Sequence, residues 1–157
     1  MFLDASVILT VLLKEQEGDA ALEAIALSAR IRSSALAVFE ASSRLAGQGA
    51  TFDEALAVVM EFIDDVKGEI VEIGATDMRA AHACASRYHH LTGHPARLNM
   101  GDCFAYAGAR TSGLKLAYKG NDFIHTDIDG VRFGPGDKGL MDAEIHPDNP
   151  NPVSRSH

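Results

Sequence analysis

The segment MFLDASVILTVLLKE, residues 1–15, begins with a short apolar run and changes character at Asp4. We predict a buried strand at Met1–Leu3, followed by a helix over Ser6–Glu15 that is rich in Val, Ile and Leu. A strand that passes within a few residues into a helix is typical of α/β proteins. The segment therefore predicts an α/β fold with a carboxylate at the end of its first strand.

The rest of the chain repeats this alternation of short strands and longer helices. Further strands are predicted at Ile31–Ser34, Glu69–Ile73, Lys115–Tyr118 and Val131–Phe133. Further helices are predicted at Asp19–Ala29, Leu36–Ala46, Phe52–Val66, Thr76–Leu91 and Met100–Ser112. Thr51 and Glu54 form the Thr-x-x-Glu pattern of a capping box, and Thr76 is the expected cap of the helix that it begins. Strands separated by helices imply βαβ units and a mostly parallel sheet.

Length and composition indicate one globular domain in a reducing compartment. The chain has 157 residues, which suits a single domain. We predict a folded domain over residues 1–133 and a Pro- and Gly-rich C-terminal tail over residues 134–157, which holds four of the five prolines. Two cysteines form no disulfide framework, so we expect a cytoplasmic protein. The apolar stretch Phe2–Leu13 is too short to span a bilayer, so no membrane association is expected.

The net charge of −8, from 22 acidic and 14 basic residues, would by itself argue against a nucleic-acid partner. Most of the acids, however, fall in runs that we assign to solvated helix faces and to the tail. Between Met78 and Asn121 the chain holds six Lys and Arg residues and one acid, Asp102. The total charge therefore does not exclude an RNA partner.

Three acids stand alone among apolar or small residues: Asp4, Glu40 and Asp102. A carboxylate is rarely buried without a partner or a metal ion. Asp4 follows the first predicted strand, and Asp122 follows the strand at Lys115–Tyr118. In a parallel sheet, functional sites gather at the carboxyl ends of the strands. We therefore expect these four acids, from distant parts of the chain, to converge at one edge of the sheet.

Converging carboxylates without clustered Cys or His suit Mg²⁺ or Mn²⁺, which prefer oxygen ligands. These ions catalyse phosphodiester hydrolysis by holding the scissile phosphate and lowering the pKa of a bound water. The carboxylates would repel one another without the ion. We therefore expect that activity requires the metal and that metal binding adds stability.

Four segments carry a resemblance to a known family: MFLDAS at 1–6, AVFEA at 37–41, LNMGDCFAYA at 98–107 and YKGNDFIHTDI at 118–128. In this order and spacing they resemble the PIN-domain ribonucleases and, more narrowly, the VapC-type toxins of bacterial toxin–antitoxin pairs. The resemblance implies a three-layer α/β/α fold and an endoribonuclease, dependent on Mg²⁺ or Mn²⁺, that cuts structured RNA such as tRNA or ribosomal RNA. It also implies a homodimer, inhibited by a cognate antitoxin whose tail enters the active site.

The same resemblance assigns roles to individual residues. The catalytic and metal-binding acids are Asp4, Glu40, Asp102 and Asp122. Asp127 is the alternative to Asp122 as the fourth acid. Ser6 and Asn99 would support the site by hydrogen bonds.

Each acid also has a purely structural interpretation. Asp4 could cap the first helix, and Asp122 could be a turn residue. Glu40 could form an ordinary helix contact with Arg44, four residues later. Asp102 would be stabilised by the helix dipole whatever its function.

The spacing of two histidines suggests a zinc site, which we consider less well supported. His90 and His94 are four residues apart, but Gly93 ends the predicted helix between them and no zinc motif is present. These histidines and nearby arginines fit an approach for an RNA backbone better. Cys103 lacks a His partner, so we interpret it as a packing residue rather than a nucleophile.

Two other functions of the whole protein remain open. One is a non-catalytic module that binds antitoxin and operator DNA. The other is a metal-dependent nuclease that acts on DNA.

Overall fold

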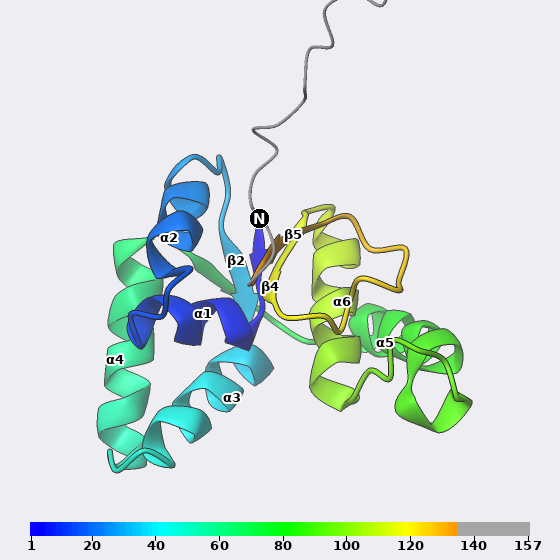
Figure 1. The fold of residues 1–157 in the computed structure, drawn as a ribbon, viewed down its shortest axis with the longest axis horizontal. Helices are drawn as coiled ribbons and strands as arrows, with labels where there is room; N and C mark the ends of the chain where they lie inside the picture. Colours follow the sequence, from blue (N-terminus) through cyan, green and yellow to red (C-terminus); the bar gives the residue numbers. More distant parts are fainter. Residues whose placement is uncertain (135–157) are drawn as a thin grey trace, which may run out of the picture.

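The structure is a computed structural model that describes residues 1–134, so all but the first residue of the predicted tail at 134–157 lies outside the described residues. The strands are β1 (Phe2–Leu3), β2 (Arg32–Ser34), β3 (Glu69–Val71), β4 (Leu116–Lys119) and β5 (Gly130–Phe133). They form one sheet in the order β3-β2-β1-β4-β5, in which every neighbouring pair is parallel (Figure 1). The predicted α/β fold with a parallel central sheet is confirmed.

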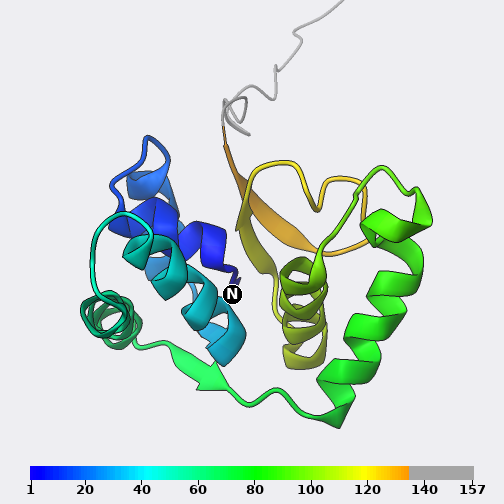
Figure 2. The same cartoon turned by 90° about the horizontal axis from the view of Figure 1, so that it is seen from below.

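Six α-helices and a short 3₁₀-helix connect the strands within residues 1–134. They are α1 (Ala5–Leu12), α2 (Gly18–Ala26), α3 (Ala35–Ala46), α4 (Phe52–Asp65), α5 (Ala75–Tyr88), η1 (His90–Thr92) and α6 (Met100–Ser112). Figure 2 shows α1 to α4 grouped on one side of the molecule and α5 and α6 on the other. In the described part of the chain, no helix is long and apolar enough to cross a membrane.

The two groups of helices cover opposite faces of the sheet. Neighbouring side chains of a strand point to opposite faces, so each strand can contribute to both layers of packing. Phe2 and Leu116 pack in the core formed with α5 and α6. Leu3 and Ala117, each the next residue along its strand, pack in the core formed with α1 to α4. The sheet therefore has a hydrophobic core on each face, as the predicted three-layer α/β/α arrangement requires.

The contact between α6 and β1 is unusually close. A Cβ atom at Gly108 of α6 would overlap the ring of Phe2 in β1. Only glycine allows the helix backbone to rest directly on this ring. The contact fixes α6, which carries Asp102, against the strand that Asp4 directly follows.

The ends of several helices differ from the sequence-based expectation. The predicted capping box at α4 is confirmed: Thr51 N donates to Glu54 Oε2 at 2.9 Å, and Glu54 N donates to Thr51 Oγ1 at 3.2 Å. The prediction that Thr76 caps the next helix is wrong. The helix α5 begins after Gly74, because Asp77 Oδ2 accepts the N–H of Gly74 at 2.9 Å.

Candidate active site

The four predicted acids lie at the carboxyl ends of the central strands. Asp4 directly follows β1, and Asp122 lies in the loop after β4. Glu40 lies in α3, which begins directly after β2, and Asp102 lies in the first turn of α6. All four line one cavity of about 340 Å³. The structure thus brings together the acids that the sequence predicted to converge.

Ser6 links two of the strand ends at this cavity. Its hydroxyl donates a hydrogen bond to Asp4 Oδ2, and the backbone N–H of Ser6 donates to the same oxygen at 3.0 Å. The hydroxyl oxygen also accepts the N–H of Lys119 at 3.0 Å. Because Lys119 is the last residue of β4, Ser6 holds the Asp4 carboxylate in a fixed position relative to that strand.

Asn99 and Asp102 form a capping box at the start of α6. Asp102 N donates to Asn99 Oδ1 at 3.0 Å, and Asn99 N donates to Asp102 Oδ2 at 2.8 Å. Negative charge is also stabilised in this first turn by the helix dipole. The structural and functional interpretations of Asp102 are therefore compatible, since the capping box fixes a carboxylate that lines the cavity.

Glu40 approaches α6 at Gly101. A Cβ atom at Gly101 would lie 2.9 Å from Glu40 Oε2 and 3.2 Å from Asn99 Oδ1. Any larger residue would therefore push the Glu40 carboxylate away from the start of α6. The Asn-x-Gly-Asp motif contained this signal, but the role of the glycine could not be inferred without knowing that Glu40 lies beside it.

Arg132 holds the loop that carries Asp122. Its guanidinium donates from Nε to the carbonyl oxygen of Gly120 at 2.7 Å and from Nη2 to Asn121 Oδ1 at 2.5 Å. Gly120 has a φ of +98°, a left-handed conformation that favours glycine. Sequence reasoning missed Arg132, because nothing in the local pattern joins it to a loop twelve residues earlier.

Asp127, the alternative fourth acid, lies outside the cavity. Its carboxylate accepts hydrogen bonds from Tyr106 Oη at 2.7 Å and from Arg87 Nη1 at 2.9 Å. The bond from Tyr106, followed by that from Arg87, lowers the pKa of Asp127 to about 2. Asp127 therefore ties the segment before β5 to α5 and α6, whereas Asp122 lines the cavity.

Burial and mutual repulsion raise the pKa values of three acids of the cavity, Asp4, Glu40 and Asp102. Burial is the main cause for Asp4, where hydrogen bonds from Ser6 oppose it and the charge of Asp122 adds to it. Burial also raises the pKa of Asp102 to about 7, opposed by the N–H of Asn99 and increased by the other three acids. The pKa of Glu40 is raised by burial and then by the charge of Asp4, and is lowered by Arg44. A cation in the cavity would offset this repulsion.

The carboxylates surround the cavity without forming a closed ligand cage. Within residues 1–134, no three His, Cys, Asp or Glu side chains are already grouped as a metal site. The histidines form no such group among these residues either. His94 packs edge-on against Tyr88, with ring centroids 5.0 Å apart. Cys103 is buried in the core formed with α5 and α6. The carboxylates of the cavity are therefore the groups that would hold an ion such as Mg²⁺.

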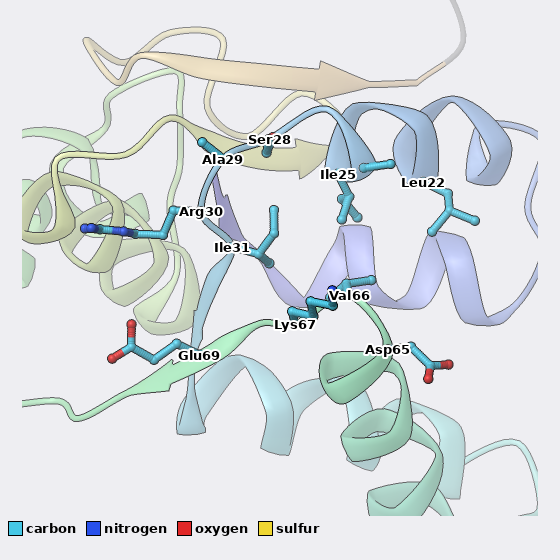
Figure 3. A pocket seen from close by; sticks show the side chains of 11 residues that line it. Leu22, Ile25, Ser28, Ala29, Arg30, Ile31, Asp65, Val66, Lys67 and Glu69 are labelled. Atoms are coloured by element: carbon cyan, nitrogen blue, oxygen red, sulfur yellow. The ribbon is translucent and has the colours of Figure 1, made fainter.

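A larger cavity, of about 470 Å³, lies at the opposite edge of the sheet, before β2 and β3. Figure 3 shows its lining, which comes from the ends of α2 and α4 and from the segments that lead into the two strands. The side chain of Arg30 points away from Ile25 and Leu22 in this view. None of the predicted catalytic acids lines this cavity, so it is separate from the candidate site.

Comparison of the sequence with known proteins gives consistent results. The family model for the PIN domain matches residues 1–129. A VapC ribonuclease of Rhizobium meliloti (strain 1021) is 40% identical over 141 residues, covering 81% of this chain and 98% of that protein. Ribonuclease VapC42 of Mycobacterium tuberculosis is 33% identical over 128 residues, covering 82% of this chain and 96% of the relative.

Two solved structures share the fold. VapBC2 from Rickettsia felis, bound to a DNA fragment from its promoter, superposes with a TM-score of 0.64 at 13% identity, covering 85% of this chain and 96% of the other. VapC20 of Mycobacterium tuberculosis, a Sarcin-Ricin loop cleaving toxin, superposes with a TM-score of 0.56 at 15% identity, covering 74% of this chain and 85% of the other. At these identities the likeness concerns the fold alone.

Proposed function

Because this chain belongs to the PIN-domain family, we propose that it is an endoribonuclease toxin of the VapC type, with its active site at the cavity lined by the four acids. Asp4, Glu40, Asp102 and Asp122 are its proposed catalytic and metal-binding residues. The observation that carries the proposal is their convergence on one cavity from four separate segments. The names of the relatives that match most of this chain support the same activity.

The proposed cofactor is Mg²⁺ or Mn²⁺. The carboxylates of the cavity offer oxygen ligands, which these ions prefer to nitrogen or sulfur. Burial and then the charges of neighbouring acids raise the pKa values of Asp4 and Asp102, and a cation would offset the repulsion between these acids. When bound, the ion supplies positive charge for the scissile phosphate and acidity for an attacking water.

The remaining residues of the site orient the acids. Ser6 holds the Asp4 carboxylate beside the end of β4, and the capping box with Asn99 holds Asp102. Arg132 holds the start of the loop that carries Asp122. Such fixed positions matter because a displacement of about 1 Å can reduce a rate by about 10²-fold.

Structured RNA is the proposed substrate, and a cognate antitoxin is the proposed regulator. Among the proteins that share the fold, VapC20 is a toxin that cleaves the Sarcin-Ricin loop, and VapBC2 is a toxin–antitoxin complex. We propose a homodimer that acts in the cytoplasm on tRNA or ribosomal RNA. Residues 1–133 are the proposed nuclease domain, and the predicted Pro- and Gly-rich C-terminal tail is residues 134–157.

Purified protein is expected to cut total tRNA or ribosomal RNA in Mg²⁺ or Mn²⁺. EDTA should abolish cleavage, and an excess of Mn²⁺ should restore it, because the carboxylates need a cation to receive a phosphate. RNA end-mapping measures the products, and single-stranded DNA of matched sequence is the control substrate. Cleavage that persists in EDTA would contradict the metal proposal. Cleavage of the DNA alone would favour a deoxyribonuclease, and no cleavage of either would favour a non-catalytic binding module.

We expect Gly101→Ala to lower the cleavage rate roughly ten- to a hundredfold, because the new methyl group displaces the Glu40 carboxylate. The free energy of unfolding should be unchanged or higher by up to about 1 kcal/mol, because alanine favours the helix. Cleavage kinetics and chemical denaturation measure the two effects.

Gly74→Ala is the matched control. A Cβ atom at Gly74 meets Asp77 Oδ2 only at 3.8 Å, and the residue lies at the start of α5, outside the cavity. Its cleavage rate should equal that of the wild type. Wild-type activity in Gly101→Ala would show that the position of Glu40 does not limit the reaction.

A further inference from the structure

Two cations line the candidate active site, and their surroundings differ. The ammonium of Lys119 lies 2.7 Å from Glu15 Oε2 and 2.9 Å from Glu17 Oε2. Both acids come from the segment that joins α1 to α2. The charge of Lys119 is thus compensated by two carboxylates, and its side chain ties this segment to the end of β4.

Arg44 is the other cation at this cavity. Arg44 lies in the last turn of α3 and is exposed to solvent. Among residues 1–134, no partner forms an ion pair or hydrogen bond with its guanidinium. The predicted helix contact with Glu40 is therefore not formed as an ion pair, although both residues line the cavity. Residues four apart on a helix share a face, so Arg44 follows Glu40 along one wall of the site.

The lining of the cavity carries more negative than positive charge. Five carboxylates line it (Asp4, Glu15, Glu40, Asp102 and Asp122), against the two cations Arg44 and Lys119. A bound cation would receive the scissile phosphate, but an RNA strand brings further phosphates beside it. A planar guanidinium with free donors is well suited to bind one of them, since it can donate two parallel hydrogen bonds to phosphate oxygens.

Other arginines of the described chain are already engaged or lie elsewhere. Arg87 donates to Asp127, and Arg132 holds the loop at Gly120. Arg30 lines the separate cavity at the opposite edge of the sheet (Figure 3). Arg44 lies at the acids, and its guanidinium forms no hydrogen bond or ion pair with the residues that the structure describes.

We propose that Arg44 binds a phosphate of the RNA backbone that flanks the scissile phosphate. The inference rests on the proposed ribonuclease function and adds a substrate-binding residue to it. In this role Arg44 contributes mainly to the affinity for RNA and little to the chemical step. Its loss should therefore raise KM and leave kcat nearly unchanged.

The test measures binding and cleavage separately. Binding of labelled tRNA is compared between Asp102→Asn and Asp102→Asn/Arg44→Ala over a range of salt concentrations. The added Arg44→Ala change should weaken binding roughly ten- to a hundredfold, the range for a lost charge-assisted hydrogen bond. The slope of log affinity against log salt should become shallower by about 0.7 to 0.9, the value for one phosphate contact.

Cleavage kinetics give the second measurement. In the otherwise unchanged chain, Arg44→Ala should raise KM by a similar factor, and Arg44→Lys should recover part of the loss because it keeps the charge. Arg30→Ala is the matched control and should behave as the wild type, because Arg30 lies at the other cavity.

The outcomes distinguish this inference from the proposed function. Unchanged binding, KM and salt slope in Arg44→Ala would overturn the inference while leaving the ribonuclease proposal intact. A fall in kcat alone would also overturn it, because Arg44 would then act through Glu40. Binding that depends on Arg44 without any cleavage by the wild type would support the inference and overturn the ribonuclease proposal. No RNA binding at all would overturn both.

Discussion

Asp102→Asn is expected to lower the rate of RNA cleavage by roughly three orders of magnitude, because a metal site of this kind contributes several kcal/mol and each 1.4 kcal/mol is about tenfold. The amide keeps an oxygen that can accept the N–H of Asn99, so the start of α6 should be retained. It removes the negative charge that attracts the cation. Asp4→Asn should have a comparable effect, because the Asp4 carboxylate is buried at the same cavity.

Circular dichroism and single-turnover cleavage of tRNA measure fold and rate. Asp64→Asn is the matched control, since Asp64 is exposed on α4 and does not line the cavity. It should cleave as the wild type does. An Asp102→Asn variant that cuts RNA at the wild-type rate would show that the active site has been assigned to the wrong residues.

Without metal, Asp102→Asn should be more stable than the wild type at pH 8 by roughly 1–3 kcal/mol, allowing for solvent screening. Burial raises the pKa of Asp102 to about 7 in the folded protein, above the usual value near 3.9 in an unfolded chain. Between these values the folded state binds more protons than the unfolded state. The stability that this group contributes is therefore complete below pH 4 and is lost as the pH rises through about 7.

Denaturation of both proteins from pH 5 to pH 8, with and without Mn²⁺, measures this difference. The advantage of Asp102→Asn should shrink as the pH falls. Mn²⁺ should stabilise the wild type by about 2.7 kcal/mol at a hundred times its Kd, and the variant much less. A variant that is less stable than the metal-free wild type at pH 8 would contradict the electrostatic account of this site.

The alternation of strands and helices and the parallel sheet could be predicted from local sequence, whereas the two layers of helices were implied by the family resemblance. Short apolar runs, helical spacing and glycines between them located every strand and every α-helix in residues 1–134. The ends of elements were less accurate. The helix predicted to continue to Leu91 stops at Tyr88, and its start depends on Asp77 and Gly74 rather than on Thr76. Several residues compete to cap a helix, and the local sequence does not decide between them.

The four acids of the candidate site could be predicted from their surroundings and from the motifs of the family. Asp4 and Asp122 follow strands, and Asp102 lies in the first turn of a helix. Glu40 stands alone among apolar or small residues of α3.

The contacts between segments could not be predicted. Glu40 of α3 lies close to Gly101 of α6. Arg132 of β5 donates a hydrogen bond to the carbonyl oxygen of Gly120, in the loop after β4. Whether Arg44 forms an ion pair with Glu40 could not be predicted either. The spacing of four residues allows this ion pair, but the structure does not form it. Such contacts depend on the packing of whole elements.

The order of the strands also governs when the protein can become active during its synthesis. The first strand made, β1, lies in the middle of the sheet between β2 and β4. Its neighbour β4 emerges from the ribosome only after most of the domain has been translated, and Asp122 follows later still. A parallel sheet with such distant pairing forms late. The growing chain therefore lacks a complete cavity until nearly the whole domain has been synthesised.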